Sequence, residues 1–214
     1  MAQIDVIPAV VESDWDALEQ KVALVAPFAP WVHINISDGS IGASETFSDI
    51  AKLSELTARY PGVSFEAHLL VANPEKYVRP LADGGFTRII AHIESNDPRR
   101  FLDEAKYDEV EVGMALDGAT EIDQVEPFLE EIDFVVVMTA EAGASGGTFL
   151  PETVEKIKLI RQNFPDLPIE AVGGITDASV KAVKDAGATR IVATDYIFKD
   201  PQHVAEAIET LKNT

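Results

Sequence analysis

Short apolar segments alternate with longer segments of helical periodicity along the whole chain. The short segments are rich in Val, Ile and Ala and are bounded by polar, Gly or Pro positions, which predicts strands. The predicted strands are 4–11, 31–36, 64–70, 88–92, 109–115, 133–139, 169–172 and 190–193. Because most of them are apolar at nearly every position, we expect a parallel sheet that is covered on both faces.

A segment of helical periodicity follows each predicted strand. These predicted helices are 14–26, 47–60, 74–81, 98–105, 121–129, 151–164, 177–186 and 201–211. Three of them have a cap residue before a first-turn proline, a typical helix start: Asn73-Pro74, Asp97-Pro98 and Asp200-Pro201. Two helices end on glycine, at Gly84-Gly85 and at Gly187.

Strand–helix units repeated eight times in 214 residues predict an α/β fold of the (β/α)8 TIM-barrel type, since an open doubly wound sheet normally uses fewer strands. No linker interrupts the pattern, so residues 1–214 are expected to form one barrel domain. In such barrels the chemistry lies at the carboxyl ends of the strands and in the loops that follow them.

The composition excludes some classes of binding partner. The net charge of −20 opposes binding to nucleic acid or to acidic membrane surfaces, and no apolar run is long enough to cross a bilayer. The chain has no cysteine, which excludes disulfides and thiolate–metal sites. Without a recognisable signal peptide, we expect a cytoplasmic protein with an acidic, solvated surface. Assembly into a homo-oligomer is possible, and the sequence does not determine it.

Histidines mark the ends of three neighbouring strands. His33 and His68 both have the parity of side chains that point into the barrel mouth, where two imidazoles can share a metal ion or serve as hydrogen-bonded pocket residues. His92 ends the next strand and is followed by Glu94, which could orient it. Glu66 and Glu170 have the same inward parity one layer lower, which indicates polar core residues, the alternative being an active role in the site.

Glycines follow the sixth and seventh strands. Gly143, Gly146 and Gly147 lie in the first of these loops, and Gly173 and Gly174 in the second. Such loops free backbone N–H groups for a phosphate, although any tight turn also uses glycine. The position favours phosphate, because barrels of this type hold it after the last strands.

The order and spacing of these motifs resemble those of the ribulose-phosphate 3-epimerases. The resemblance runs from residue 7 to about residue 198 and is carried by IPAVV at 7–11, VHINISDG at 32–39, AHLL at 67–70, HIE at 92–94, MT at 138–139, GASGGTFLP at 143–151, VGG at 172–174 and VATDYIF at 192–198. It implies a barrel of the ribulose-phosphate-binding type and an isomerase that acts on a carbohydrate phosphate, with a small phosphorylated sugar as its partner.

The resemblance also implies a divalent metal held by two histidines and two aspartates, which move the proton on either face of the sugar. The histidines are retained as His33 and His68, but the aspartate positions hold Asn35 and Val172. An amide cannot take up a proton at neutral pH, and valine offers neither charge nor lone pair. We therefore expect weak metal binding or no cofactor, and an epimerase activity that is lost or altered.

The remaining site positions agree with the family in part. Met138 is retained, Ala9 replaces a serine, and Asp38 keeps its place, where the following glycine indicates a turn. Thr194-Asp195 stands where the family has a Gly-Ser pair that binds phosphate. We hypothesise that Asp195 caps the following short helix and fills the anion site with the protein's own charge, the alternative being an aspartate that points to solvent.

Two functions are therefore open. One is an isomerase of the epimerase type with reassigned groups, and the other is a barrel without chemistry that serves as a binding or assembly module. A Schiff-base aldolase or a pyridoxal-phosphate enzyme needs a lysine at a strand end, and the sequence offers none there.

Overall fold

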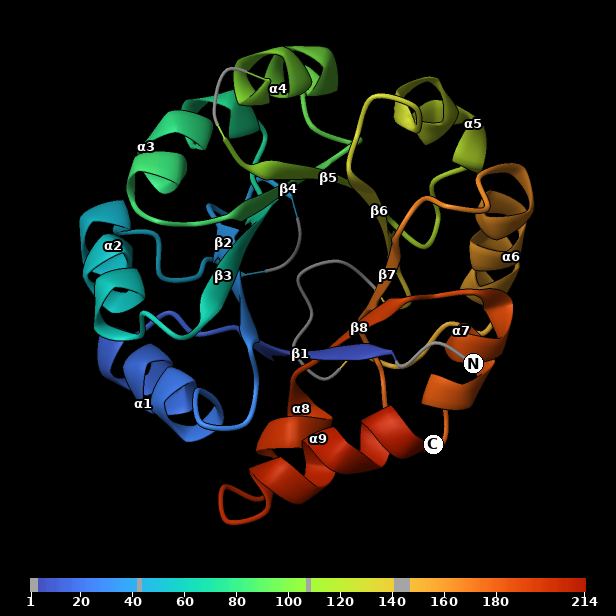
Figure 1. Cartoon of the computed structure of the whole chain (residues 1–214). Helices are drawn as coiled ribbons and strands as arrows, with labels where there is room; N and C mark the ends of the chain where they lie inside the picture. Colours follow the sequence, from blue (N-terminus) through green and yellow to red (C-terminus); the bar gives the residue numbers. More distant parts are fainter. Residues whose placement is uncertain (1–3, 42–43, 107–108, 141–146) are drawn as a thin grey trace.

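A closed parallel barrel of eight strands, ringed by helices, forms the protein (Figure 1). The computed structural model describes residues 4–41, 44–106, 109–140 and 147–214. Each strand pairs in parallel with the next one along the chain, and β8 pairs back to β1 through Ile7 and Val192. The predicted (β/α)8 fold is confirmed.

The strands occupy the apolar segments that the pattern indicated. They are β1 Asp5–Val10, β2 Trp31–Ser37, β3 Ser64–Leu70, β4 Arg88–His92, β5 Glu111–Leu116, β6 Phe134–Met138, β7 Ile169–Val172 and β8 Arg190–Ala193. The α-helices are α1 Trp15–Val25, α2 Ile50–Arg59, α3 Val78–Asp83, α4 Pro98–Ala105, α5 Ile122–Val125, α6 Thr153–Asn163, α7 Val180–Ala186, α8 Asp195–Phe198 and α9 Val204–Asn213. The 3₁₀ turns are η1 Pro74–Lys76, before α3, and η2 Glu126–Phe128, after α5.

The predicted helix caps have different outcomes. Asp97 caps α4 by accepting a hydrogen bond from the backbone N–H of Arg100 at 2.9 Å. The Asp200-Pro201 prediction is wrong, because α9 begins only at Val204 and Asp200 instead accepts from Gln202 N and contacts His203. Gly187 ends α7 in the left-handed conformation, with φ of 111°, as the glycine rule predicts.

The strands separate two groups of buried side chains. Outward-facing residues such as Val6, Ile34, Leu69 and Val135 form the larger core with the helices. The inward-facing apolar residues form a second cluster inside the barrel: Ile7, Ala9, Ile90, Ala115, Phe134, Val136, Met138, Val172 and Val192, with Trp31 packed against them. The interior is therefore a filled core, and only the ends of the barrel are accessible to a ligand.

Arginines close the amino-terminal end of the barrel. The Arg88 guanidinium lies 3.4 Å from the centre of the Trp31 ring, and Arg190 lies 4.9 Å from that of Phe134. Both arginines contact Glu111, at 2.7 Å from Arg88 Nε and 3.7 Å from Arg190 Nη2. This end is thus plugged by stacked rings and paired charges, which leaves the opposite end for the site.

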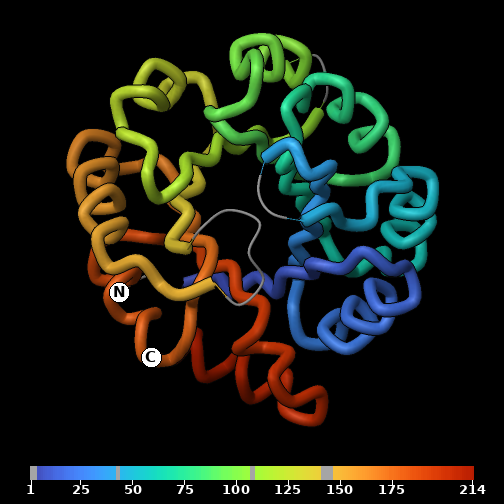
Figure 2. The backbone as a smooth tube through the Cα atoms, turned by 180° about the vertical axis from the view of Figure 1, so that it is seen from behind, coloured from blue at the N-terminus to red at the C-terminus, as the bar shows by residue number. Residues whose placement is uncertain are grey.

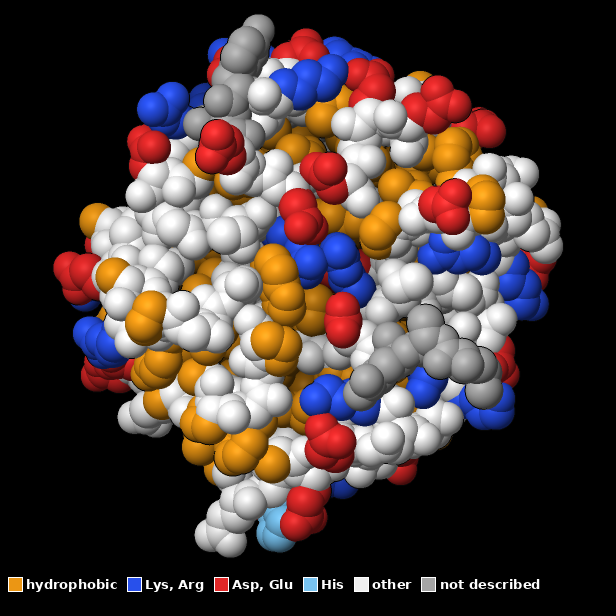
Figure 3. Space-filling model, viewed as in Figure 1, with side chains coloured by type: hydrophobic (Ala, Val, Ile, Leu, Met, Phe, Trp, Pro, Cys, Tyr) orange, Lys and Arg blue, Asp and Glu red, His pale blue; other side chains and the backbone are white. Residues whose placement is uncertain are grey.

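Charged side chains of both signs lie on the outer surface. Figure 2 shows the ring of helices from behind, and Figure 3 shows acidic side chains spread over one face among lysines and arginines. No helix in the described part of the chain is long and apolar enough to cross a membrane.

Candidate active site at the barrel mouth

A cavity of about 360 Å³ lies at the carboxyl ends of the strands. Its described lining comes from β1, β2, β6, β7, β8 and the loops that follow them: Ala9, Val11, Asn35, Met138, Gly147, Thr148, Phe149, Val172, Gly173, Gly174, Ile175, Thr176, Val192, Thr194, Asp195 and Tyr196. The volume lies in the range of small-molecule sites.

The structure brings together most of the residues that the sequence singled out. Asn35 and Val172, the two substituted aspartate positions, line the same cavity together with Ala9 and Met138. Among the described lining residues, the only carboxylate belongs to Asp195. The cavity floor therefore offers no acid or base where the family resemblance places the two proton-transferring groups.

Asn35 has an unusual environment for an amide. Its Oδ1 is buried and has no hydrogen-bond partner among the described residues. A buried polar atom without a partner is costly in free energy unless a ligand or water satisfies it. The residue lines the cavity, but this oxygen itself is shielded from it.

His33, His68 and His92 form a buried hydrogen-bonded row with a glutamate at each end. Glu66 Oε1 lies 2.7 Å from His33 Nδ1, and His33 Nε2 lies 3.2 Å from His68 Nδ1. His68 Nε2 lies 2.9 Å from His92 Nε2, and His92 Nδ1 lies 3.0 Å from Glu94 Oε2. All three rings are fully buried, and neither His33 nor His68 is among the described residues that line the cavity.

Both terminal carboxyl groups of the row have a lowered pKa. Burial raises the pKa of Glu66, but His33 and Arg88 outweigh it and lower the pKa below its ordinary value. Burial likewise raises the pKa of Glu94, and hydrogen bonds from His92, Thr120 and the Asp117 backbone outweigh it and lower the pKa to about 2. The row thus ends on a hydrogen-bond acceptor at each side.

The middle ring of the row, His68, is neutral. Burial, with the neighbouring rings of His92 and His33, lowers the pKa of His68 well below its ordinary value. A neutral imidazole accepts a hydrogen bond at one nitrogen and donates at the other, which suits a ring that has a neighbour on each side.

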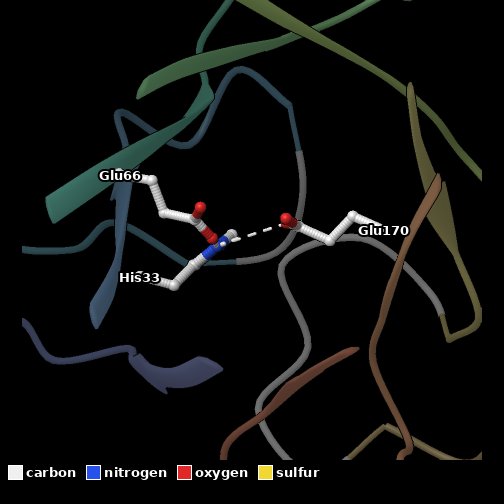
Figure 4. Close-up of side chains that lie close together, drawn as sticks. All are labelled: His33, Glu66 and Glu170. Carbon is white, nitrogen blue, oxygen red and sulfur yellow. Dashed lines mark hydrogen bonds and ion pairs between the residues drawn. The ribbon is translucent and has the colours of Figure 1, made fainter. Parts of the chain in front are cut away.

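A second carboxyl group lies beneath His33. Figure 4 shows Glu170, from β7, pointing toward the pair that His33 makes with Glu66, and its Oε1 lies 3.8 Å from His33 Nδ1. Burial and the negative charge of Glu66 raise the pKa of Glu170 well above its ordinary value, which favours the neutral acid. These side chains are fully buried, as expected for a polar core layer.

The residues present do not fit a tightly held divalent metal at the mouth. His33 Nε2 and His68 Nδ1 face each other, but they are joined by a hydrogen bond, and the aspartates expected beside them are Asn35 and Val172. Among the described residues, His33, Glu66 and Glu170 have ligand atoms within 4.8 Å of one another. That cluster lies on the opposite side of the His33 ring, where Arg88 already donates to Glu66 at 3.3 Å.

Close packing explains why the two residues after β7 are glycines. Gly173 and Gly174 have positive φ values of 103° and 65°. A Cβ on Gly173 would lie 2.8 Å from Ala140 Cβ, and one on Gly174 would lie 2.6 Å from Phe149 N. Both glycines are therefore required by the close packing of this turn against the segment after β6, whatever they do for a ligand.

The remaining predicted site residues are placed as follows. Asp38 is exposed and accepts hydrogen bonds from the backbone N–H and hydroxyl of Ser40, which is the turn role that its sequence context indicated. Thr194 is the N-cap position of α8 and Asp195 is the first residue of that helix, so the prediction that Asp195 itself occupies the N-cap is wrong. Gly143 and Gly146 lie outside the described residues, whereas Gly147 lines the cavity.

Several residues of the site were missed. The continuous row through His68 and His92 depends on which ring nitrogens face each other, which no sequence pattern contains. Arg88 and Arg190 share the inward parity of Glu66 and Glu170, and that parity could have indicated a charged layer. Thr148 and Thr176 lie in the segments that connect β6 to α6 and β7 to α7, and Tyr196 lies in α8 after β8, so their place after these strands could have indicated them.

The barrel and its mouth define the class as a (β/α)8 protein with one site at the carboxyl end of its strands. Solved structures support the fold: the 3-hexulose-6-phosphate synthase from Salmonella typhimurium matches with a TM-score of 0.77, 12% identity and coverage of 98% of this chain and 97% of that one. A second crystal structure of 3-hexulose-6-phosphate synthase matches with a TM-score of 0.74 and 17% identity, over 98% and 99% of the two chains. At such identities the likeness shows the fold alone.

Sequence comparison gives the family. The model of the Ribulose-phosphate 3 epimerase family matches residues 5–198. The ribulose-phosphate 3-epimerase of Schizosaccharomyces pombe is 31% identical over 100% of this chain and 95% of its own length. The cytoplasmic isoform from Oryza sativa subsp. japonica is also 31% identical, over 97% and 93% of the two chains. The chain belongs to the ribulose-phosphate 3-epimerase family.

Proposed function

We propose that this chain binds a sugar-type ligand in the barrel mouth but does not epimerise ribulose 5-phosphate at the rate of its relatives. The observation that carries the proposal is the occupancy of the cavity floor by Asn35 and Val172, with no carboxylate there among the described lining residues. Each general acid or base typically contributes ~10²- to 10⁴-fold in rate, so the loss of both removes most of the proton transfer.

The histidine row does not replace the missing groups. His33 and His68 are fully buried and face each other and their glutamate or histidine neighbours. A base must reach within hydrogen-bond distance of the proton that it takes. None of the three histidines is among the described residues that line the cavity, so the row has no group placed to take a proton from a ligand there.

A binding or assembly module without chemistry is the second candidate. The same substitutions favour it, because a cavity that retains its shape without an acid or base can still hold a ligand. Both candidates predict no proton exchange on ribulose 5-phosphate above background, so an exchange measurement separates the two of them from an active epimerase.

Proton exchange in heavy water tests the proposal. We expect the wild-type protein to leave the proton at carbon 3 of ribulose 5-phosphate unexchanged above background, with the Schizosaccharomyces pombe relative as the positive control. We also expect elemental analysis of the purified protein to find no stoichiometric metal. Exchange at the rate of that relative, or one firmly held zinc, iron or manganese per chain, would overturn the proposal.

Restoring the two carboxylates sharpens the test. The double variant Asn35→Asp/Val172→Asp is expected to gain metal binding and at least ~10²-fold in exchange rate. The matched control, Asn35→Asp/Val172→Asn, introduces a side chain of similar size without the second acid–base group and should gain much less. Equal rates for the two variants would show that the missing carboxylate at residue 172 is not what limits the chemistry.

A further inference from the structure

We propose that the ligand of the mouth cavity is a sugar phosphate whose end remote from the phosphate lacks a hydroxyl group, as in a 1-deoxy ketopentose phosphate. The inference deepens the proposed function and rests on it, since it names the class of ligand that the same cavity takes. It follows from the separation of apolar and polar groups between the inner and the outer part of the cavity.

The inner wall of the cavity is an apolar floor made of Ala9, Met138, Val172 and Val192. All four residues line the cavity and also belong to the apolar cluster that fills the barrel. They come from β1, β6, β7 and β8, which are neighbours in the closed barrel (Figure 1). In the strand register Met138 pairs with Val172, and Val172 pairs with Val192, so three of these side chains form a continuous row. A ligand that reaches this floor meets carbon atoms.

The histidine row cannot compensate a ligand hydroxyl at the apolar floor. All six of its ring nitrogens are engaged, with Glu66, with Glu94 or with one another. Its rings are fully buried, and none of them is among the described residues that line the cavity. Asn35 does line the cavity, but its Oδ1 is shielded from it. A hydroxyl that is buried without a partner loses its hydrogen bonds to water, which lowers affinity.

Hydroxyl-bearing side chains lie in the outer part of the cavity. Thr148 is exposed, and Thr176 and Thr194 are partly buried, whereas the residues of the apolar floor are almost completely buried. Threonine hydroxyls can donate to phosphate oxygens, and they can also accept from a sugar hydroxyl. The lining therefore suits a ligand that keeps its phosphate and hydroxyl groups near solvent and places a deoxygenated end against the apolar floor.

Two sugar phosphates that differ in one hydroxyl test the inference. 1-Deoxy-D-xylulose 5-phosphate has a methyl group where D-xylulose 5-phosphate has a hydroxymethyl group, at the carbon remotest from the phosphate. Titration calorimetry would measure the binding of each compound to the wild-type protein. We expect the deoxy compound to bind at least ~tenfold more tightly, because an unpaired buried hydroxyl costs about that factor in affinity.

An isosteric substitution tests whether the apolar floor causes the preference. Val172 has the largest exposed fraction of the four floor residues, 7%, and Val172→Thr replaces one of its methyl groups with a hydroxyl of similar size. We expect this variant to bind D-xylulose 5-phosphate more tightly than the wild type does, and the preference for the deoxy compound to fall below ~threefold. Ala9→Ser adds a hydroxyl to the same floor and should act in the same direction.

Val63→Thr is the matched control. Val63 directly precedes β3, at the opposite end of the barrel, and is not among the described residues that line the cavity, so both affinities should stay as in the wild type. A wild-type preference below ~tenfold, or one in the opposite direction, would overturn the inference, and so would equal effects of Val172→Thr and Val63→Thr.

Failure of the wild type to bind either sugar phosphate would overturn the inference together with the binding part of the proposed function. Proton exchange at carbon 3 is a separate measurement. The catalytic part of the proposed function therefore fails or stands on its own test.

Discussion

Glu94 ties the histidine row to the protein surface at a single carboxylate. It accepts hydrogen bonds from His92, from the Thr120 hydroxyl and from the backbone N–H of Asp117 at 2.9 Å. Its side chain is only 26% exposed. Since the pKa of Glu94 is about 2 in the folded protein, against an ordinary value of 4.5, the ionised carboxylate stabilises the fold.

The pH dependence of the variant Glu94→Gln follows from this shift. The contribution of Glu94 is fully present above pH 4.5 and is lost as the pH falls toward 2. We expect Glu94→Gln to lower the free energy of unfolding by about 1–2 kcal/mol at pH 7, and the difference from wild type to shrink through that window. Urea denaturation at several pH values measures it, with the exposed Glu130→Gln as the control. A difference that stays constant down to pH 2 would contradict the assignment.

Part of the candidate site could be predicted from the sequence. Strand ends and the family resemblance placed Asn35, Met138 and Val172 at the mouth, and these residues line the cavity. Parity placed Glu66 and Glu170 one layer lower, where they are fully buried, but it also pointed His33 and His68 into the mouth, and neither is among the described residues that line the cavity. Parity could not give the direction of each histidine ring, because rotation about the side-chain bonds decides which nitrogen meets which neighbour.

At the scale of elements, the predicted strands agree with the structure to within two residues at each end. Long apolar runs bounded by polar residues leave little ambiguity in a sheet that is buried on both faces. The helix starts were harder to predict. Residues 47–49 and 201–203 precede α2 and α9, and α5 is continued by η2. Polar side chains such as Asp200 bond several nearby donors, so a cap residue before proline does not by itself determine where a helix begins.

Gly187 illustrates an element boundary that the sequence did define. Its φ of 111° is unfavourable for other residues, and an added Cβ would lie 2.7 Å from Arg161 Cγ. Arg161 also donates to the Gly187 carbonyl from Nε at 3.1 Å and from Nη2 at 2.9 Å. The end of α7 and the α6 side chain that supports it thus depend on this glycine.

The variant Gly187→Ala is expected to lower the free energy of unfolding by about 1–3 kcal/mol, through backbone strain and displacement of Arg161. Chemical denaturation measures the change. Gly62→Ala is the matched control, because a Cβ there meets nothing within 4 Å and its φ is not positive. Equal stability of the two variants would show that the left-handed conformation carries no cost here.

For the whole molecule, the net charge of −20 is the dominant electrostatic feature. Acidic side chains are spread over the face shown in Figure 3. The chain has 37 acidic residues and only 17 basic ones, so there are too few basic side chains to pair with every carboxylate. Repulsion among like charges opposes the compact state and is screened by salt.

We therefore expect the thermal midpoint of unfolding to rise by roughly 5 °C or more between 0.05 and 1 M sodium chloride. Differential scanning calorimetry measures the shift. Glucose at matched osmolality provides the control for effects unrelated to charge screening. A midpoint that falls with added sodium chloride would show that attractive ion pairs outweigh the overall repulsion.

The histidine row connects three neighbouring strands through side chains alone. His33, His68 and His92 come from β2, β3 and β4, and each ring contacts the next through a ring nitrogen. Glu66 and Glu94 stand at the two ends of the row. The loss of any one ring would leave buried neighbours without one of their partners, so the three positions are constrained together although they are far apart in the sequence.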